Sequence, residues 1–334
     1  MRFKIFLLSF AASVPFWLGV NFLNGRLENI LFLGKIASDP QIMAAALNQQ
    51  ALGQRVGGVT PLKRPNPDAL KIGAKAVLSV LINENGEKEI LFSKNAEEKL
   101  AIASLTKLMS AYVVVNYFDL SGDLKITPEA LLRRGAAENL KPGEIFKVRD
   151  VLYSSLVESD NDGISALSQL ASQKGFVALM NLEAGYLGLN NTGFFNSTGL
   201  DPEDPREPAN FSTAKDMAFL SAEVFKNPLI SRILSSEEFD LYDSRNVFNH
   251  KSISTNELLI SPPDFKNMKI IAGKTGETSR AGGCLVLVLG NQSKKQILVN
   301  VILGSDNRFG EMKELTDWTI ASLNYRNYLN TLLY

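Results

Sequence analysis

The sequence predicts an α+β protein in which one antiparallel sheet is flanked by helices and carries an inserted, mainly helical lobe. Two strand-like segments come first, and a long block with apolar residues at three- and four-residue spacing follows them. Three more strand-like segments and a last helix complete the domain. Strands from both ends of the domain are therefore expected to share one sheet, with the central helices forming a second lobe.

Each element follows from a local pattern. Residues 76–82 (AVLSVLI) are rich in β-branched side chains, and residues 88–94 (KEILFSK) follow them after Asn85-Gly86, a pair typical of a tight hairpin turn. The remaining predicted elements are helices at 104–118, 148–157, 162–173, 176–188 and 212–226, strands at 268–276, 283–290 and 296–304 with a turn at 291–294, and a helix at 311–329.

The N-terminal segment has the character of a membrane anchor. Arg2 and Lys4 precede 19 uncharged residues, Ile5 to Leu23, and about 20 apolar residues are enough to cross a bilayer. The apolar run continues past the small residues near its start, so we expect an uncleaved anchor with the rest of the chain exported; a cleaved signal peptide is the alternative. The chain then divides into an anchor or signal at 1–24, a tether at 25–72 and a globular domain at 73–334.

Composition excludes several classes of function. The 35 basic and 35 acidic residues cancel, which argues against nucleic acid as a partner. The single cysteine, Cys284, allows no internal disulfide, and its apolar surroundings predict a buried strand thiol. Any Ser-His-Asp triad would need the single histidine, His250, which we expect on the surface or in a loop. One histidine and one cysteine cannot supply the usual zinc ligands, so we expect no metal.

Ser104 and Lys107 are the candidate nucleophile and base. Residues three apart lie on the same side of a helix, so Lys107 can reach the Ser104 hydroxyl, and a Ser-Lys pair is a known variant of triad logic. The same spacing recurs in Ser212-Thr213-Ala214-Lys215. There, Asp216 and an apolar helix follow, which is typical of a capped helix N-terminus.

Two further motifs distinguish Ser104 from the second site. Ser159-Asp160-Asn161 interrupts an otherwise helical stretch, and Lys274-Thr275-Gly276 lies at the end of a predicted strand. S-x-x-K followed by S-D-N and K-T-G is the signature of penicillin-binding proteins and class A β-lactamases. All three occur here in that order.

From about Ala76 to Ser322 the sequence resembles the D-alanyl-D-alanine carboxypeptidases, the low-molecular-mass penicillin-binding proteins. The matching segments are IASLTKLMSA, LYSSLVESDNDGISALS, FVALMNLEAGYLGLNNTGFFNSTGLD, FSTAKDMAFLS, IAGKTGETSRAGGCLVLV and VILGSDNRFGEMKELTDW. The resemblance implies a penicillin-binding protein/β-lactamase-like transpeptidase fold and no cofactor. It also implies peptidoglycan stem peptides as substrates and β-lactam antibiotics as covalent inhibitors.

The resemblance makes residues 73–334 a serine D,D-peptidase domain, without the β-rich C-terminal domain that many members carry. With the anchor, it places the protein in the bacterial cell membrane, with the catalytic domain outside the cytoplasm. Ser104 would attack the D-Ala-D-Ala carbonyl, and Lys107, neutral near pH 7, would be the base. A lowering of the lysine pKa by ~3 units takes about 4 kcal/mol, and burial and the Lys274 cation both act in that direction. Ser159 would relay a proton to the leaving amine.

The other site residues would hold the substrate. The resemblance implies that Asn161 binds the substrate amide and Lys107, and that Lys274 and Thr275 bind the substrate carboxylate. Gly276 would let the strand backbone approach the substrate. The backbone N–H groups of Ser104 and Glu277 would form the oxyanion hole. Arg308 matches the arginine that the family uses near the terminal carboxylate.

Two residues depart from the family pattern. Asp160 stands where the family more often has glycine, which is closer to the β-lactamases, and Glu277 places an acid beside the expected oxyanion hole. The sequence predicts a serine-type D-Ala-D-Ala carboxypeptidase, or alternatively a D,D-endopeptidase that cuts crosslinks. A β-lactamase is a further alternative, although no E-x-x-L-N segment supplies its deacylating glutamate. An inactive cell-wall binding protein is the alternative from another class, and the intact motifs argue against it.

Overall fold

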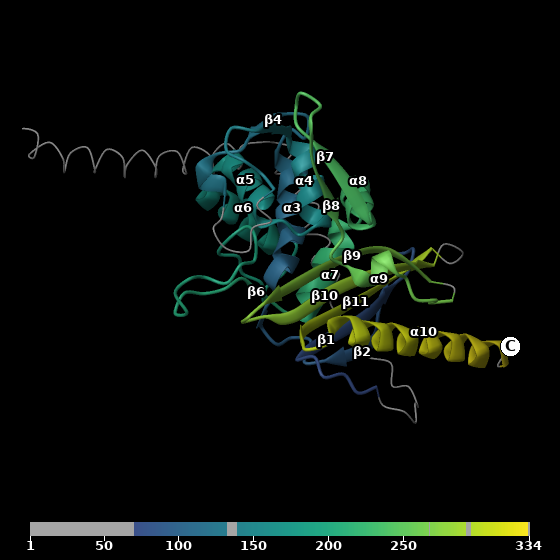
Figure 1. The fold of residues 1–334 in the computed structure, drawn as a ribbon. Helices are drawn as coiled ribbons and strands as arrows, with labels where there is room; N and C mark the ends of the chain where they lie inside the picture. Colours follow the sequence, from purple (N-terminus) through teal and green to yellow (C-terminus); the bar gives the residue numbers. More distant parts are fainter. Residues whose placement is uncertain (1–69, 132–138, 267, 292–294, 333–334) are drawn as a thin grey trace, which may run out of the picture. The chain divides into compact units, whose positions relative to one another are not determined.

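The computed structural model describes residues 70–131, 139–266, 268–291 and 295–332 (Figure 1). The predicted anchor and nearly all of the predicted tether lie outside the described residues, as does most of the turn predicted at 291–294. Within the described ranges, no helix combines the length and the apolar character that crossing a membrane requires.

One five-stranded antiparallel sheet joins the two ends of the domain, with the strand order β2-β1-β11-β10-β9. Its strands are β1 (Ala76–Ile82), β2 (Lys88–Lys94), β9 (Lys269–Thr278), β10 (Gly282–Asn291) and β11 (Gln296–Ser305). The β1–β2 connection contains the predicted Asn-Gly pair, and Gly86 takes a φ of 81° there. In β1, Ala76 lies opposite Leu303 of β11, so the first strand pairs directly with the last. The single sheet built from both ends of the domain is confirmed.

Helices cover both faces of this sheet. Figure 1 shows α7 (Ala214–Val224) and α10 (Arg308–Leu332) on opposite sides of it, and each helix packs on β10 and β11. Burial on two faces explains why β1, β10 and β11 are nearly continuous apolar runs rather than alternating ones. Cys284, on β10, is fully buried as predicted, and burial raises the pKa of its thiol to about 11.

The helical lobe lies between β2 and β9 in the chain. Its helices are η2 (Ala103–Leu105), α3 (Thr106–Tyr117), η3 (Pro128–Ala130), α4 (Val148–Val157), α5 (Asn161–Ser168), η4 (Gln169–Ala171), α6 (Gln173–Tyr186), α8 (Pro228–Leu234) and α9 (Glu257–Ile260). The predicted helices are confirmed apart from small shifts of their ends. The prediction omitted α8, α9 and the short strand pairs β3 (Leu100–Ala101) with β6 (Phe211–Ser212), β4 (Asp123–Lys125) with β5 (Ile145–Lys147), and β7 (Glu238–Tyr242) with β8 (Phe248–Ile253).

The expectation of a surface or loop histidine at His250 is wrong. His250 lies on β8, its side chain is 14% exposed, and its Nε2 is 2.8 Å from Glu158 Oε1. The β7–β8 hairpin packs on α4, and this packing buries the histidine beside the Ser154 and Ser252 hydroxyls, which lie 2.7 Å apart.

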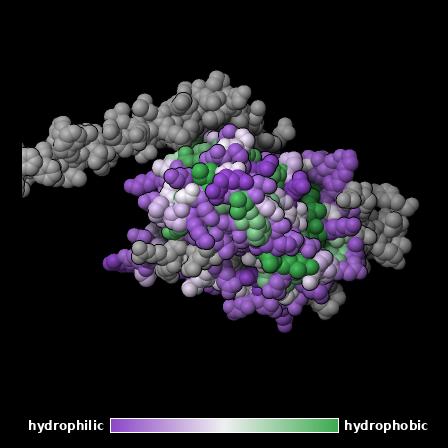
Figure 2. Space-filling model, turned by 45° about the horizontal axis from the view of Figure 1, so that its top comes forward, coloured by the Kyte–Doolittle hydropathy of each residue, from purple (hydrophilic) through white to green (hydrophobic). Residues whose placement is uncertain are grey.

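Hydrophilic side chains cover most of the face shown in Figure 2, and apolar groups gather there only in separate patches. The exposed large apolar side chains of the described residues are Ile145, Phe195, Tyr242, Val247, Phe248, Ile253 and Ile260. Three of them come from the β7–β8 hairpin strands. The rings of Tyr242 and Phe248 pack edge to face with their centres 5.6 Å apart, so part of the exposed apolar surface is gathered on this hairpin.

Candidate active site

The candidate nucleophile, Ser104, lies on the tight turn η2 that leads into α3. The residue before it, Ala103, has a φ of 46°, a left-handed conformation that residues other than glycine rarely adopt. Gly199 packs against this turn so closely that a Cβ at Gly199 would come within 1.9 Å of the Ala103 carbonyl oxygen. The strained turn leaves Ser104 partly exposed, whereas Ala103 and Leu105 are buried.

Lys107 lies one helical turn after Ser104, and its side chain is fully buried. Its Nζ is 2.9 Å from Ser104 Oγ, 2.7 Å from Asn161 Oδ1 and 2.9 Å from the carbonyl oxygen of Thr198. A neutral amine has two N–H donors and one lone pair. Two donors are sufficient for Asn161 and Thr198, which leaves the lone pair for the Ser104 hydroxyl proton.

Burial lowers the pKa of Lys107 to about 7, the direction that a role as a base requires. The nearby Asp160 carboxylate opposes the lowering. The predicted repulsion between the two site lysines is seen at Lys274 instead. Burial, then repulsion from Lys107 and from Arg308, lowers the pKa of Lys274 well below its ordinary value. The two lysines are therefore both shifted away from the charged state.

Ser159 lies in the sharp turn between α4 and α5, with a φ of 64°. Lys274 Nζ donates to Ser159 Oγ at 2.8 Å. Asn161 begins α5 and reaches Lys107 from the same turn. The predicted interruption of the helix is thus confirmed, and it directs Ser159 toward Lys274 and Asn161 toward Lys107.

Asp160 is the N-cap of α5. Its two carboxylate oxygens accept from the backbone N–H groups of Asp162, at 3.1 Å, and Gly163, at 2.7 Å. Burial raises the pKa of Asp160, with the Glu158 charge acting in the same direction and the two backbone donors opposing it. An acid at this position therefore has a local structural explanation, because aspartate is among the preferred N-cap residues.

The K-T-G residues lie on β9, the edge strand of the sheet. Lys274 is 1% exposed and its Nζ also donates to the Thr275 carbonyl at 3.0 Å. The hydroxyl of Thr275 is hydrogen-bonded to that of Thr255. A Cβ at Gly276 would lie 2.9 Å from the backbone nitrogen of Ser104, so glycine is what allows β9 to approach the nucleophile turn.

Arg308 is the first residue of α10 and lies beside the C-terminal end of β9. Its Nη1 forms an ion pair with Glu277 and lies 3.4 Å from the Gly276 carbonyl oxygen. The Arg308 side chain is 20% exposed, so it is not the solvated surface arginine that its position near a helix start would also allow. The hydrogen bonds and the ion pair link the predicted site residues in three groups, one around Lys107, one around Lys274 and one around Arg308.

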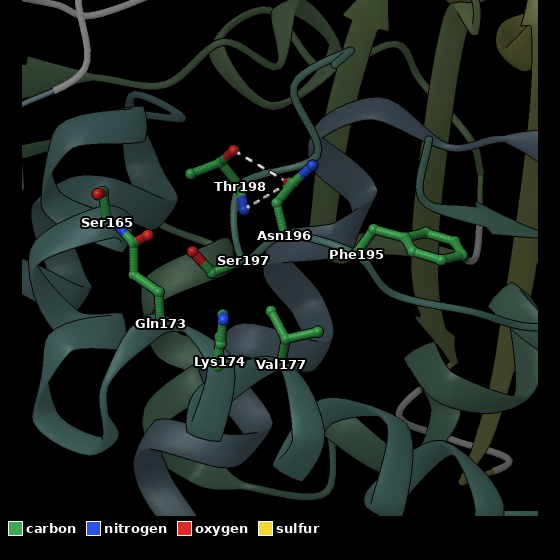
Figure 3. Close-up of a pocket in the computed structure, with 8 residues that line it drawn as sticks. All are labelled: Ser165, Gln173, Lys174, Val177, Phe195, Asn196, Ser197 and Thr198. Carbon is green, nitrogen blue, oxygen red and sulfur yellow. Dashed lines mark hydrogen bonds between the residues drawn. The ribbon is translucent and has the colours of Figure 1, made fainter. Parts of the chain in front are cut away.

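One site group has no counterpart in the sequence prediction, namely the Thr198 carbonyl that accepts from Lys107. Asn196 shapes the loop that carries it, because its Oδ1 accepts from the backbone N–H group of Thr198 at 3.1 Å (Figure 3). The same oxygen accepts from the backbone N–H group of Gly199 at 2.7 Å. Ser110, on α3, donates to the Ser197 carbonyl at 2.6 Å. The segment was recognised as part of the resemblance, but a backbone carbonyl gives no residue-type signal.

A pocket of about 350 Å³ lies against the same loop (Figure 3). It is lined by Ser165, Gln173, Lys174, Val177, Phe195, Asn196, Ser197 and Thr198. The two sites share Thr198, whereas none of the S-x-x-K, S-D-N or K-T-G residues lines the pocket. The pocket therefore adjoins the candidate active site and is not part of its reactive centre.

The second S-x-x-K stretch is a helix start, as predicted. Thr213 caps α7 and its hydroxyl accepts from the Asp216 N–H at 3.0 Å, while Ser212 is buried on β6. Lys215 forms an ion pair with Glu97 instead of approaching Ser212. Within the described residues, no group of three or more His, Cys, Asp or Glu side chains is placed to hold a metal ion.

The sequence is similar to those of known proteins. A sequence model of D-alanyl-D-alanine carboxypeptidases matches residues 63–307. The chain belongs to this family. It is 33% identical over 248 residues to the D-alanyl-D-alanine carboxypeptidase DacC of Escherichia coli (strain K12), covering 69% of this chain and 58% of that one. It is 30% identical over 245 residues to the D-alanyl-D-alanine endopeptidase of Pseudomonas aeruginosa, covering 72% of this chain and 76% of that one.

A solved structure confirms the fold. The penicillin-binding protein D2 of Listeria monocytogenes, in an ampicillin-bound form, is similar with a TM-score of 0.62 and 26% identity, over 75% of this chain and 98% of that one. The predicted penicillin-binding protein/β-lactamase-like fold is therefore correct. The chain spans only 58% and 52% of the length of two curated carboxypeptidase relatives.

Proposed function

We propose that this protein is a serine-type D-Ala-D-Ala carboxypeptidase that removes the terminal D-alanine from peptidoglycan stem peptides. The observation that supports it most is a fully buried Lys107 amine with a pKa of about 7, 2.9 Å from the Ser104 hydroxyl. A base with a pKa near the operating pH combines a substantial neutral fraction with proton-accepting strength.

In the proposed acylation step, Lys107 takes the hydroxyl proton and Ser104 Oγ attacks the carbonyl carbon of the D-Ala-D-Ala bond. Ser159 already accepts from Lys274, so its own hydroxyl proton is available for the leaving amine. The backbone N–H groups of Ser104 and Glu277 hold the oxyanion, at ~3–4 kcal/mol per donor. Lys274, together with Thr275 and Arg308, binds the terminal carboxylate.

In the proposed deacylation step, departure of D-alanine leaves space for a water that Lys107 activates. A β-lactam keeps its ring-opened amine tethered in the site, and that group blocks the water. We therefore expect stoichiometric, long-lived acylation by penicillin, with a burst followed by little turnover. With a D-Ala-D-Ala peptide we expect steady release of free D-alanine.

Two substitutions test the nucleophile. Ser104→Ala should abolish covalent labelling by a fluorescent penicillin, and Ser212→Ala, in the second S-x-x-K stretch, should leave it intact. Labelling that survives the first change and disappears with the second would reverse the assignment. Sustained penicillin hydrolysis without release of D-alanine would instead favour a β-lactamase.

A D,D-endopeptidase is the second candidate, because the chain is 30% identical to the Pseudomonas aeruginosa endopeptidase and also 30% identical to each of two carboxypeptidases. Incubation with defined muropeptides and mass analysis of the products separates the two. Loss of one D-alanine from monomers supports the carboxypeptidase, and conversion of crosslinked dimers to monomers supports the endopeptidase.

We also propose that residues 73–334 form an exported peptidase domain, which residues 1–24 hold to the bacterial cell membrane through the tether at 25–72. The uncharged run from Ile5 to Leu23 supports this. The full chain should sediment with membranes, and a chain that begins at Gly73 should stay in the supernatant and still react with penicillin. Mature protein that begins near residues 12–16 would show a cleaved signal peptide.

A further inference from the structure

The ion pair between Glu277 and Arg308 lies where the proposed substrate would place its terminal carboxylate. Glu277 directly follows Gly276 on β9, and Arg308 Nη1 contacts both the Glu277 carboxylate and the Gly276 carbonyl. The guanidinium is thus held at the end of the strand whose Lys274 faces Ser159. The Glu277 carboxylate is therefore already paired with Arg308, the cation that we propose for the substrate carboxylate.

The two partners differ in how firmly they are held. The Arg308 side chain is 20% exposed, its guanidinium lies 5.0 Å from the Phe309 ring centre, and its Nε is buried. The Glu277 side chain is 66% exposed. The arginine is therefore the fixed member of the pair, and the glutamate can move into solvent.

The pair is also incomplete. Glu277 binds through Nη1, while Nε has no hydrogen-bond partner among the described residues. An arginine and a carboxylate bind most strongly through two parallel hydrogen bonds. A carboxylate held by one nitrogen and largely exposed is displaceable, and such pairs change an equilibrium by up to about fivefold.

We propose that Glu277 determines leaving-group specificity by competing with the substrate carboxylate for Arg308. The proposal rests on the carboxypeptidase function given above. A substrate with a free C-terminal carboxylate must displace Glu277 or accept its repulsion. A substrate whose leaving residue ends in a carboxamide need not displace it and can donate an N–H to Glu277. The site therefore discriminates less against C-terminally amidated leaving groups than it would with a neutral residue at this position.

The test compares Glu277→Gln with the wild type on two substrates, an N-acylated D-Ala-D-Ala with a free C-terminus and the same peptide as its C-terminal amide. Glu277→Gln should lower KM for the free acid by about two- to fivefold, with no gain for the amide, so the acid-to-amide ratio of kcat/KM should rise by the same factor. Glu277→Asp, which keeps the charge, should stay close to the wild-type preference. Glu97→Gln is the matched control, because it removes a similarly exposed partner, 62% exposed, from the ion pair with Lys215.

A double variant assigns the effect to Arg308. In an Arg308→Gln background the change at Glu277 should alter the acid-to-amide ratio less than it does with Arg308 present, because the competition for the guanidinium is gone and only direct repulsion remains. A higher KM for the free acid in Glu277→Gln would mean that Glu277 positions Arg308, and equal changes for both substrates would exclude competition; either result overturns the proposal. A wild-type protein that labels with penicillin but releases neither D-alanine nor its amide would refute the carboxypeptidase function instead.

Discussion

The pH dependence of acylation is the most direct test of Lys107 as the base. Burial lowers its pKa from 10.5 to about 7, which at 1.36 kcal/mol per unit amounts to about 5 kcal/mol of preference for the neutral amine. If the neutral form is the reactive one, the acylation rate constant should follow its fraction. That fraction is about nine-tenths at pH 8, half at pH 7 and one-tenth at pH 6.

We therefore expect the second-order rate constant for a fluorescent penicillin, measured by stopped flow, to reach a plateau above pH 8. It should fall about tenfold between pH 8 and pH 6 and tenfold again at pH 5. A lysine with an ordinary pKa would give a rate that still rises tenfold per unit through pH 9. Either that rise or a flat profile from pH 5 to pH 8 would refute Lys107 as a base prepared by burial.

Asp160→Asn sharpens this test. The Asp160 charge raises the pKa of Lys107, so its removal should lower that pKa and move the falling limb of the profile to lower pH. Asparagine is as good an N-cap as aspartate, so α5 should remain intact. A limb that moves to higher pH, in a variant whose unfolding free energy is unchanged, would contradict the electrostatic argument.

Three further predictions concern the packing around the nucleophile turn. Gly199→Ala should lower the free energy of unfolding, measured in urea, by more than about 3 kcal/mol, because its Cβ would meet a carbonyl oxygen at 1.9 Å. Gly188 is the control, because it also has a positive φ but no atom lies within 4 Å of the position that its Cβ would take; Gly188→Ala should lower the same free energy by only about 1 kcal/mol. Gly276→Ala, whose Cβ would lie 2.9 Å from the Ser104 nitrogen, should slow penicillin acylation at least about tenfold and lower the free energy of unfolding only slightly. A large loss of stability with nearly normal acylation would show that this contact serves the fold. Asn196→Ala should lower the free energy of unfolding by about 1–3 kcal/mol and slow acylation, and normal acylation would show that the loop carbonyl is not needed to hold Lys107.

The sequence predicted the main sheet and the principal helices because periodicity reports burial directly. The strand β1 is buried on both faces over nearly its whole length, and its apolar run is unmistakable. The β7–β8 hairpin was missed because its strands are mostly exposed and carry a weak alternation. His250 was misplaced for the same reason, since its burial depends on how that hairpin packs against α4.

The site was predictable where side-chain chemistry fixes the residue type. Two serines, two lysines and an asparagine in three ordered motifs predict the reactive groups. In the structure Lys107 is hydrogen-bonded to Ser104 and Asn161, and Lys274 to Ser159. The Thr198 carbonyl was not predictable, because any residue supplies one. The contact between Glu277 and Arg308 was also beyond the sequence, since it depends on how α10 meets the end of β9.

Neither of the two unusual acids is free to activate water, so the proposed cycle assigns that step to Lys107, the amine beside Ser104. Both carboxylate oxygens of Asp160 are engaged by backbone N–H groups of α5, and Glu277 is turned toward Arg308. Neither has the role of the separate deacylating glutamate that a β-lactamase needs. In the proposed cycle Ser159 gives its proton to the leaving amine and receives a proton from protonated Lys107. Lys107 is then neutral again and can activate the deacylating water. An acyl group that keeps its amine in the site blocks the approach of that water to Lys107, which is the physical reason to expect a penicillin-sensitive peptidase here.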